Sequence, residues 1–399
     1  MPILNIIIRL AKNERTQIWI LVVFFVGFSI KSFEIPFYHD YPAYIEQWKI
    51  TLTNPEALRD LGTNAYGPTH NIISLMYAIH PNLPRILFCG IWIGAGILLL
   101  RRCAKNHLPS WTRWLILFFL YVNPYFFRLY EYGQNDLFVS GILLMAIILH
   151  REKKDIPGGT FFALALSYKF YPLVMIPFLC IDFKEVSKLR DIRKSFRINF
   201  FLSLIASLAV LAGLAYLALG ESFLSPYQFL INRSTTTTES SFAYFWQHSM
   251  NSSFFAKLGF LPVAILLAGM CVMAYIKRWS SYFSAILALL LTFLLSPVFY
   301  YVYIIGCLAL LFEYTTWQSQ KQLKMSDWIA PFAYVFLMSF VFILNALLAK
   351  DPSIPFSVWK GLIYAIPNGA LLVLLVGTNL GWFNFLDNRD IGRPSNPLA

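Results

Sequence analysis

Residues 158–183 read GGTFFALALSYKFYPLVMIPFLCIDF, an apolar run with a lysine and a proline near its centre. Basic residues crowd both of its ends, in 151–154 before it and in 184–197 after it. A membrane-spanning helix needs about 20 residues, so this run is too short for two full spans. Because Lys and Arg gather on the cytoplasmic side of membrane proteins, the run enters and leaves on that same side. We interpret it as a hairpin of short, tilted or re-entrant helices with Lys169 near its tip.

The composition of the whole chain excludes a soluble domain. Apolar residues make up 58% of the chain and charged residues 13%, whereas soluble domains carry about 25% charged residues. The net charge of +12 would suggest nucleic acid as the partner of a soluble protein. Here most Lys and Arg lie in short clusters between apolar runs, so orientation in the membrane explains the charge and no nucleic-acid partner is expected.

Apolar runs of spanning length are expected to form membrane helices, and a second broken run covers 282–313, interrupted at Ser296-Pro297. The sequence therefore predicts an all-α polytopic membrane protein with about 10–12 transmembrane or re-entrant helices. The full-length candidates are 17–35, 83–100, 111–128, 134–150, 198–220, 254–276, 328–349 and 359–380.

The basic clusters place both termini in the cytoplasm and divide the chain by sidedness. We expect a single transmembrane domain over 1–399. Its parts are a cytoplasmic N-terminus at 1–16, a first outer loop at 36–82, a second outer loop at 221–253 and a cytoplasmic tail at 381–399.

The first outer loop brings a carboxylate to the membrane surface. It begins Pro-Phe-Tyr-His-Asp-Tyr-Pro at 36–42, so Asp40 closely follows the first span. An amphipathic segment at 43–51 and a short apolar run at 71–79 are expected to be interfacial helices. The alternative for Asp40 is a solvated loop acid or a helix cap.

A second polar constellation lies in the tight outer turn between two spans. Asn123-Pro124 leads to Arg128, and Glu-Tyr-Gly-Gln-Asn-Asp follows at 131–136. Charges at membrane depth are costly and mark functional pathways. The alternative is an ion pair between Arg128 and Glu131, one helical turn apart, that caps the bundle.

Lys169 is the third polar feature, and it lies more than ten residues from either basic cluster. An ammonium inside an apolar run costs several kcal/mol unless it is paired or hydrated. A phosphate partner would remove this cost. The alternatives are snorkelling to an interface or an ion pair with an acid such as Glu131 or Asp136. Within the second broken run, Tyr300 and Tyr301 follow the break at Ser296-Pro297 and belong either to a cavity wall or to an aromatic belt.

Together these groups predict an outward cavity that holds a carboxylate, cations, amides and aromatic rings. Such a cavity suits a lipid-linked anionic substrate whose head group reacts at the outer surface.

The order of the motifs resembles that of the GT-C membrane glycosyltransferases, and within them glycosyltransferase family 87. That family includes polyprenyl-phosphate-mannose-dependent mannosyltransferases. The resemblance covers most of 18–310, is strongest at 121–182, and includes Lys-x-Tyr-Pro-Leu at 169–173. Two departures stand out. The family's Tyr-Pro-Pro is Tyr66-Gly67-Pro68 here, and its Gly-Gln-x-Asn ends in Asp136.

The resemblance implies a reaction and a role for each polar group. Asp40 would be the general base that takes the proton of the acceptor hydroxyl, and a single displacement would invert the sugar, expected to be mannose. The leaving polyprenyl phosphate needs cations rather than a proton donor, with Lys169 as the first candidate and Arg128 as the second. The substrate-binding residues would be His39, Tyr66, Glu131, Gln134, Asn135, Asp136, Tyr171, Tyr300 and Tyr301.

The expected partners are the polyprenyl-phosphate sugar donor, a lipid or glycan acceptor, and membrane lipid. No ligand cluster in the sequence requires a metal, and no cofactor is expected; a divalent metal is left open as an alternative. The membrane would be the plasma membrane in a bacterium and the endoplasmic reticulum in a eukaryote. Two other functions remain open: a flippase or transporter of a lipid-linked or anionic substrate, to which broken helices and intramembrane charges also point, and a polysaccharide polymerase.

Overall fold

The computed structural model describes residues 13–37, 40–59, 66–225, 228, 242–296, 304–318, 326–348, 356–380 and 382. The longer helices are α2 (Glu14–Ser32), α3 (Tyr41–Thr53), α6 (Leu83–Lys105), α7 (Ser110–Tyr121), α9 (Asp136–Arg151), α10 (Asp155–Tyr168), α13 (Ile198–Leu219), α17 (Leu261–Lys277), α18 (Ser281–Leu295), α19 (Ile304–Gln318), α20 (Ile329–Leu348) and α21 (Phe356–Asn379). The shorter helices and 3-10 turns are α4 (Pro68–Ile72), α5 (Ser74–Ile79), α8 (Pro124–Glu131), α11 (Ile176–Cys180), α12 (Ile192–Ser195), α15 (Phe242–Ser249), α16 (Phe254–Leu258), η1 (Pro55–Arg59), η2 (Tyr171–Met175), η3 (Leu189–Asp191), η4 (Gly220–Leu224) and η6 (Ser326–Trp328).

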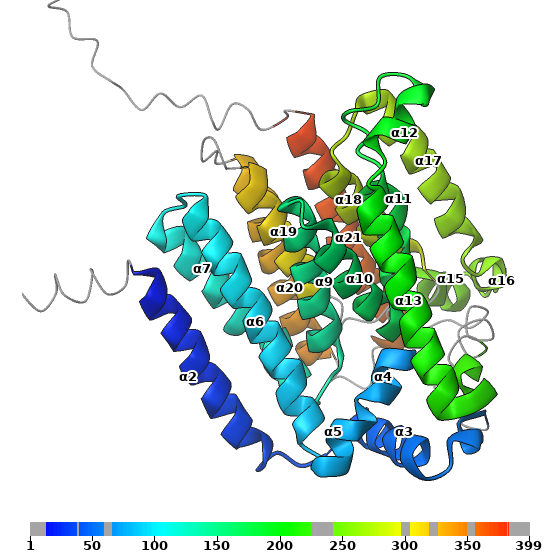
Figure 1. The fold of residues 1–399 in the computed structure, drawn as a ribbon. Coiled ribbons are helices and arrows are strands. Elements are labelled where there is room, and N and C mark those ends of the chain that lie inside the picture. The colour runs from blue at the N-terminus through cyan, green and yellow to red at the C-terminus, as the bar shows by residue number, and fades with distance from the viewer. Residues whose placement is uncertain are drawn as a thin grey trace, which may run out of the picture.

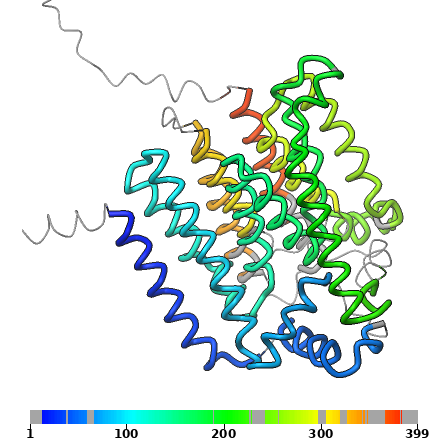
Figure 2. The backbone as a smooth tube through the Cα atoms, viewed as in Figure 1, coloured from blue at the N-terminus to red at the C-terminus, as the bar shows by residue number. Residues whose placement is uncertain are grey.

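The long helices stand side by side in one bundle with two chemically different ends (Figure 1). We call the end that carries Arg102, Arg151 and the segment 184–197 the basic end, and the end that carries α3, α4 and α5 the loop end. The start of α2 and the end of α21 both lie at the basic end (Figure 2). The two predicted outer loops meet at the loop end, because η1 packs against η4.

Some of the described helices have the length and composition of membrane spans. Three of the described helical segments are apolar enough to cross a membrane: α2, α6, and α13 continued by η4. The bent pair of α8 and α9 makes up to four, and several shorter apolar helices accompany them. The prediction of an all-α polytopic membrane protein is confirmed.

Two expected spans are each divided into two helices in the structure. The run 254–276 comprises α16 and α17, with Gly259 and Phe260 between them. The run 111–128 does not form one helix, because α7 ends at Tyr121 and a separate helix, α8, begins at Pro124. Asn123 is extended between them, and its side chain accepts a hydrogen bond from the backbone N–H of Phe126. Asn-Pro therefore ends one helix and caps the next. Helix α8 is bent by 120° from α9.

The segment 158–183 forms the predicted hairpin. Helix α10 leaves the basic end, η2 and α11 return to it, and α10 packs between α9 and α13. The two ends of the hairpin are tied together by Arg197, whose guanidinium lies 3.1 Å from the carboxylate of Asp155 and whose backbone N–H donates to Cys180 at 2.8 Å. Helix α10 ends where Lys169 turns extended, so the polar tip lies inside the bundle.

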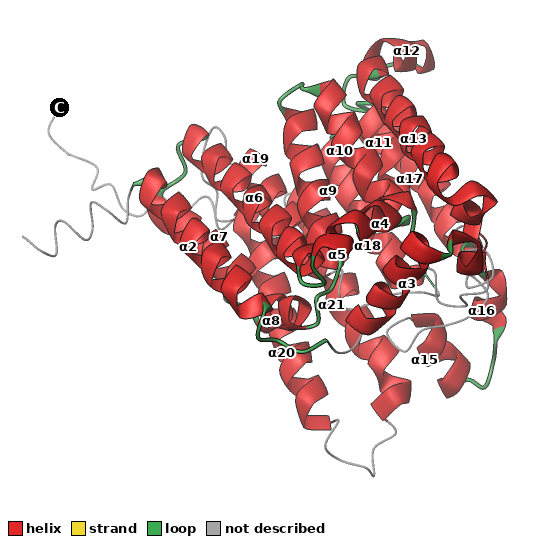
Figure 3. Cartoon of the chain, turned by 60° about the horizontal axis from the view of Figure 1, so that its bottom comes forward, coloured by secondary structure: helices red, strands yellow, loops and turns green. Residues whose placement is uncertain are grey.

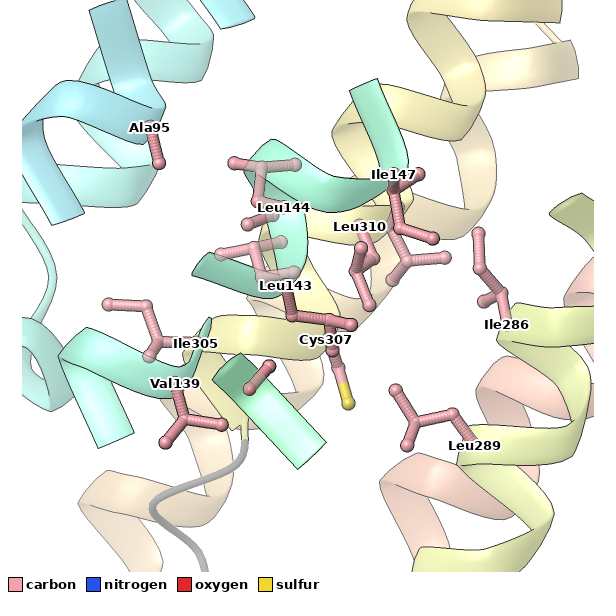
Figure 4. Packing of buried hydrophobic residues seen from close by; sticks show 14 of the residues in the cluster. Ala95, Val139, Leu143, Leu144, Ile147, Ile286, Leu289, Ile305, Cys307 and Leu310 are labelled. Atoms are coloured by element: carbon pink, nitrogen blue, oxygen red, sulfur yellow. The ribbon is translucent and has the colours of Figure 1, made fainter. Parts of the chain in front are cut away.

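The apolar core surrounds α9, which is buried along most of its length. Helix α9 packs against α6 and α19, and Figure 4 shows residues of α9, α18 and α19 in the same apolar cluster, among them Leu143, Ile286 and Ile305. The start of α18 lies near the end of α19, where the rings of Tyr282 and Trp317 are 5.5 Å apart. At the basic end, the buried Arg151 donates to the buried carboxylate of Glu313 and so joins α9 to α19.

The first predicted outer loop is helical and covers the loop end. Figure 3 turns this end toward the viewer and shows α3, α4 and α5 running across it. Helix α3 buries Tyr44 and Trp48 and exposes its other face, as its amphipathic pattern predicts. Helix α4 continues inward and packs on α10, so the loop reaches the tip of the hairpin.

Candidate functional site

Four segments that are distant in sequence converge beneath the loop end. Asp40 begins α3, Tyr66 precedes α4, Gln134 lies in the turn between α8 and α9, and Lys169 ends α10. The side chain of Asp40 is exposed, whereas Gln134 and Lys169 are buried. The sequence placed these residues in one cavity, and the structure brings them together.

A chain of hydrogen bonds fixes the exposed carboxylate. The Nε2 atom of Gln134 donates to a carboxylate oxygen of Asp40 at 2.6 Å. The hydroxyl of Tyr44 donates to the Oε1 atom of the same amide at 2.8 Å, and the hydroxyl of Tyr66 donates to that of Tyr44 at 3.3 Å. Asp40 therefore accepts from a donor whose own orientation is set by a third residue.

The phenol of Tyr44 keeps its proton, and this fixes the direction of the hydrogen bond to Gln134. Burial raises the pKa of its phenol well above the usual value, and the nearby acids raise it further. The hydroxyl therefore stays protonated at neutral pH and acts as a donor to Gln134.

The turn that carries Gln134 depends on a glycine. Gly133 adopts φ +60°, a left-handed conformation that favours glycine. It also lies against Tyr41, since a Cβ atom there would be 2.4 Å from the ring. The close approach of Gly133 to the residue after Asp40 brings Gln134 within reach of the carboxylate.

Lys169 forms an ion pair with Asp136 at the start of α9. Its Nζ atom lies 2.8 Å from each carboxylate oxygen of Asp136, whose side chain is 0% exposed. The ammonium also lies 5.4 Å from the centre of the Tyr66 ring, within cation–π range. Of the explanations that the sequence left open for Lys169, the ion pair with Asp136 is present in the structure.

Next to the ion pair, the segment 67–70 of the first loop packs tightly against the end of α10. A Cβ atom on Gly67 would lie 1.9 Å from the carbonyl oxygen of Ser167, so the two backbones touch at this point. Nδ1 of the buried His70 lies 2.7 Å from the hydroxyl of Tyr168. Burial lowers the pKa of His70 well below its usual range, and Lys169 lowers it further. His70 is therefore neutral at neutral pH.

The other predicted site residues lie at different depths. Arg128 donates from Nε to the hydroxyl of Tyr132 at 3.0 Å, and Glu131 is exposed. Asn135 is buried near the hydroxyls of Tyr66 and Tyr168, without a hydrogen bond of ordinary geometry. The ring of Tyr171 packs on Phe293, 5.4 Å between centres. His39, Tyr300 and Tyr301 lie outside the described residues.

The predicted site residues did not include Tyr44, His70 and Arg85. Tyr44 was identified only as an apolar position of an amphipathic helix, although a phenol that is buried needs a hydrogen-bond partner. Arg85 lies in an apolar helix, and such a charge is itself a signal. In the part of the chain that the structure describes, no group of three His, Cys, Asp or Glu side chains is placed to hold a metal ion.

The arrangement combines an oriented, exposed carboxylate with a buried ion pair and nearby aromatic rings. A search of curated proteins gives no match to the chain. The sequence model of Glycosyltransferase family 87 matches residues 86–300, more than half of the chain, and confirms the predicted resemblance. The matched region contains Gln134, Asp136 and Lys169, and it starts after Asp40. The protein belongs to glycosyltransferase family 87 and is a membrane glycosyltransferase.

Proposed function

We propose that the protein transfers a hexose, with mannose as the first candidate, from a polyprenyl-phosphate sugar to a lipid-linked or glycan acceptor at the outer face of the membrane. The observation that carries the proposal is the geometry of Asp40. This carboxylate is exposed to an incoming hydroxyl, and its orientation is fixed by Gln134 at 2.6 Å. A general base must be within reach of the proton that it accepts.

In the proposed step, the acceptor oxygen forms a bond to the anomeric carbon while Asp40 takes its proton. The bond between the anomeric carbon and the phosphate oxygen breaks, and polyprenyl phosphate leaves with the electron pair. A single displacement inverts the configuration at the anomeric carbon of the sugar. The leaving group departs as an anion, so it needs positive charge and no proton donor.

We propose Lys169 and Arg128 as the cations that face the donor phosphate. Lys169 is held in place by Asp136, and a positioned ammonium is a compact partner for phosphate. The first candidates for contacts with the sugar are Tyr66, whose ring lies 5.4 Å from the ammonium of Lys169, Gln134, which donates to Asp40, and the buried Asn135. Glu131, which is exposed, and Tyr171, whose ring packs on Phe293, are further candidates for substrate contacts in the same proposal.

The test uses purified protein in liposomes, radiolabelled polyprenyl-phosphate mannose and a panel of membrane acceptors. Asp40→Asn should lower the transfer rate by about 10²–10⁴-fold, the usual contribution of a positioned base. The matched control is Glu46→Gln, which alters an exposed acid of the same loop on α3 and should leave the rate unchanged. Near-normal transfer by Asp40→Asn would show that Asp40 is a loop acid and would end this assignment.

The outer location has its own test. Helix α12, within the basic segment 184–197, lies at the opposite end of the bundle from α3, which begins directly after Asp40 (Figure 1). Basic segments favour the cytoplasmic side. In a bacterium Asp40 would therefore face outward across the plasma membrane, and in a eukaryote it would face into the endoplasmic reticulum. In a variant without the five native cysteines, Glu46→Cys should react with an impermeant maleimide from the outside, whereas Glu185→Cys should not. The reverse pattern would place Asp40 in the cytoplasm.

A further inference from the structure

Arg85 is a buried cation in the first turn of α6, one of the helices that is apolar enough to cross a membrane. Its side chain is 1% exposed. A charge in such a place is costly unless hydrogen bonds compensate it, so the contacts of Arg85 indicate what it does for the fold.

The guanidinium binds the backbone where α2 ends. One terminal nitrogen donates to the carbonyl oxygens of Ser32 and Ile35, at 3.2 and 3.0 Å, and the other lies 3.4 Å from that of Pro36. The last carbonyls of a helix lack partners within the helix and carry partial negative charge. A planar cation with several donors satisfies these carbonyls and fixes the direction in which the chain leaves α2.

The same guanidinium also contacts the residue that follows Asp40. Its central carbon lies 4.7 Å from the centre of the Tyr41 ring and 5.4 Å from that of Phe37. The hydroxyl of Tyr41 donates to the carbonyl oxygen of Pro81 at 2.7 Å, and the ring packs against Gly133. Arg85 therefore touches the chain on both sides of Asp40, and through Tyr41 it reaches the turn that carries Gln134.

We propose that Arg85 is a positioning residue for the transfer reaction: it clamps the end of α2 and the ring of Tyr41, and so holds Asp40 at hydrogen-bonding distance from Gln134. This inference rests on the proposed role of Asp40 as the base. Arg85 acts through the backbone and a neighbouring ring, without touching the substrate. An error of about 1 Å in the placement of a catalytic group can cost roughly 10²-fold in rate.

The test compares Arg85→Met, Arg85→Lys and a matched control on the same helix. Arg85→Met keeps much of the apolar stem and loses every donor, so kcat should fall by roughly 10²-fold while the KM for the donor stays within about twofold. Arg85→Lys keeps the charge but lacks the planar fork, so kcat should be intermediate. The control Arg102→Met removes a buried arginine at the basic end, where its partner is Glu152 at 3.1 Å, and should leave kcat unchanged.

Amide hydrogen exchange provides a readout that does not depend on activity. Arg85→Met should speed exchange in peptides that cover the end of α2 and the start of α3, and Arg102→Met should not. If Arg85→Met does not fold, Arg85→Lys carries both measurements, with a smaller change expected in each.

The outcomes separate this inference from the proposed function. Unchanged kcat and unchanged exchange in the Arg85 variants, beside an inactive Asp40→Asn, would overturn the role of Arg85 and leave the base assignment intact. An active Asp40→Asn would remove the proposed function instead, and the exchange data alone would then decide whether Arg85 holds this segment in place. A rise in KM with unchanged kcat would also overturn positioning, because it would mean that Arg85 contributes to binding.

Discussion

Gln134 presents its amide nitrogen to Asp40 because the hydroxyl of Tyr44 occupies the amide oxygen, at distances of 2.6 and 2.8 Å. An amide that is free to rotate could offer either its donor or its acceptor to a carboxylate. The hydroxyl of a buried tyrosine removes this ambiguity, since it stays protonated. The orientation of the proposed base therefore depends on Tyr44, which acts on the carboxylate through Gln134.

We expect Tyr44→Phe to lower kcat about tenfold, less than the loss of the base itself. The substitution removes the hydroxyl and keeps the ring, so the amide of Gln134 can turn its oxygen toward Asp40. Leaving a buried acceptor without its donor should also lower stability by about 1–3 kcal/mol. Initial rates and thermal unfolding of the purified variant provide both measurements.

Tyr77→Phe is the control for this experiment. Tyr77 lies on α5 of the same loop, and its ring contacts Trp48 at 5.8 Å between centres. Its hydroxyl is not part of the chain that leads to Asp40, so kcat should not change. Equal effects of the two substitutions would mean that the hydroxyl of Tyr44 does not orient the amide.

The sequence was sufficient to predict the membrane fold and the hairpin, because basic clusters on both sides of an apolar run allow few topologies. It also indicated that Asp40, Gln134 and Lys169 would meet, since each is a polar group in an apolar setting. The break at Asn123-Pro124 was underestimated, although Pro at a first helical position is a known start signal. The apolar run 111–128 is long enough for one span, so the prediction followed its length and disregarded the helix cap at Asn123-Pro124.

The partner of Lys169 was not predictable from sequence. Glu131 and Asp136 were both available, and the 120° bend between α8 and α9 decides between them by turning Asp136 inward and leaving Glu131 exposed. The role of Arg85 was hidden for a similar reason. Its partners are backbone carbonyls at the end of α2 and just beyond it, and no side chain in the sequence identifies them.

The protonation of His70 predicts a pH dependence of stability. In the unfolded chain His70 has an ordinary pKa near 6.5, whereas burial and Lys169 lower its pKa in the fold. The unfolded state therefore takes up a proton first as the pH falls. The contribution of neutral His70 to stability is fully present above about pH 6.5 and decreases as the pH falls toward the folded pKa.

The measurement is the thermal midpoint of the native protein and of His70→Gln between about pH 7.5 and pH 5. The native protein should lose stability as the pH falls, and the variant should lose less. His70 is faced by the rings of Tyr44, Trp48, Tyr66 and Tyr168, so the comparison of the two proteins isolates the imidazole. Every other titrating group is common to both. Identical slopes would mean that His70 does not titrate on unfolding.

The ion pair between Lys169 and Asp136 separates a phosphate site from a purely structural contact. Removing one partner from a buried ion pair usually costs about 3–5 kcal/mol, because the other charge is left uncompensated. Lys169→Met should therefore destabilise the protein, and the double variant Lys169→Met/Asp136→Leu should recover most of that loss. Stability alone does not distinguish the two explanations, so donor affinity has to be measured beside it.

Asp136→Asn is the informative variant, because it keeps an acceptor for Lys169 and removes the negative charge that neutralises it. If the ammonium faces the donor phosphate, as we propose, this variant should bind a polyprenyl-phosphate sugar at least as tightly as the native protein, while Lys169→Met and the double variant bind it more weakly. The double variant is decisive since its fold is restored and its cation is absent. Native donor affinity in the double variant would mean that the pair serves only the packing of α9 against α10, and that the phosphate must be sought at Arg128.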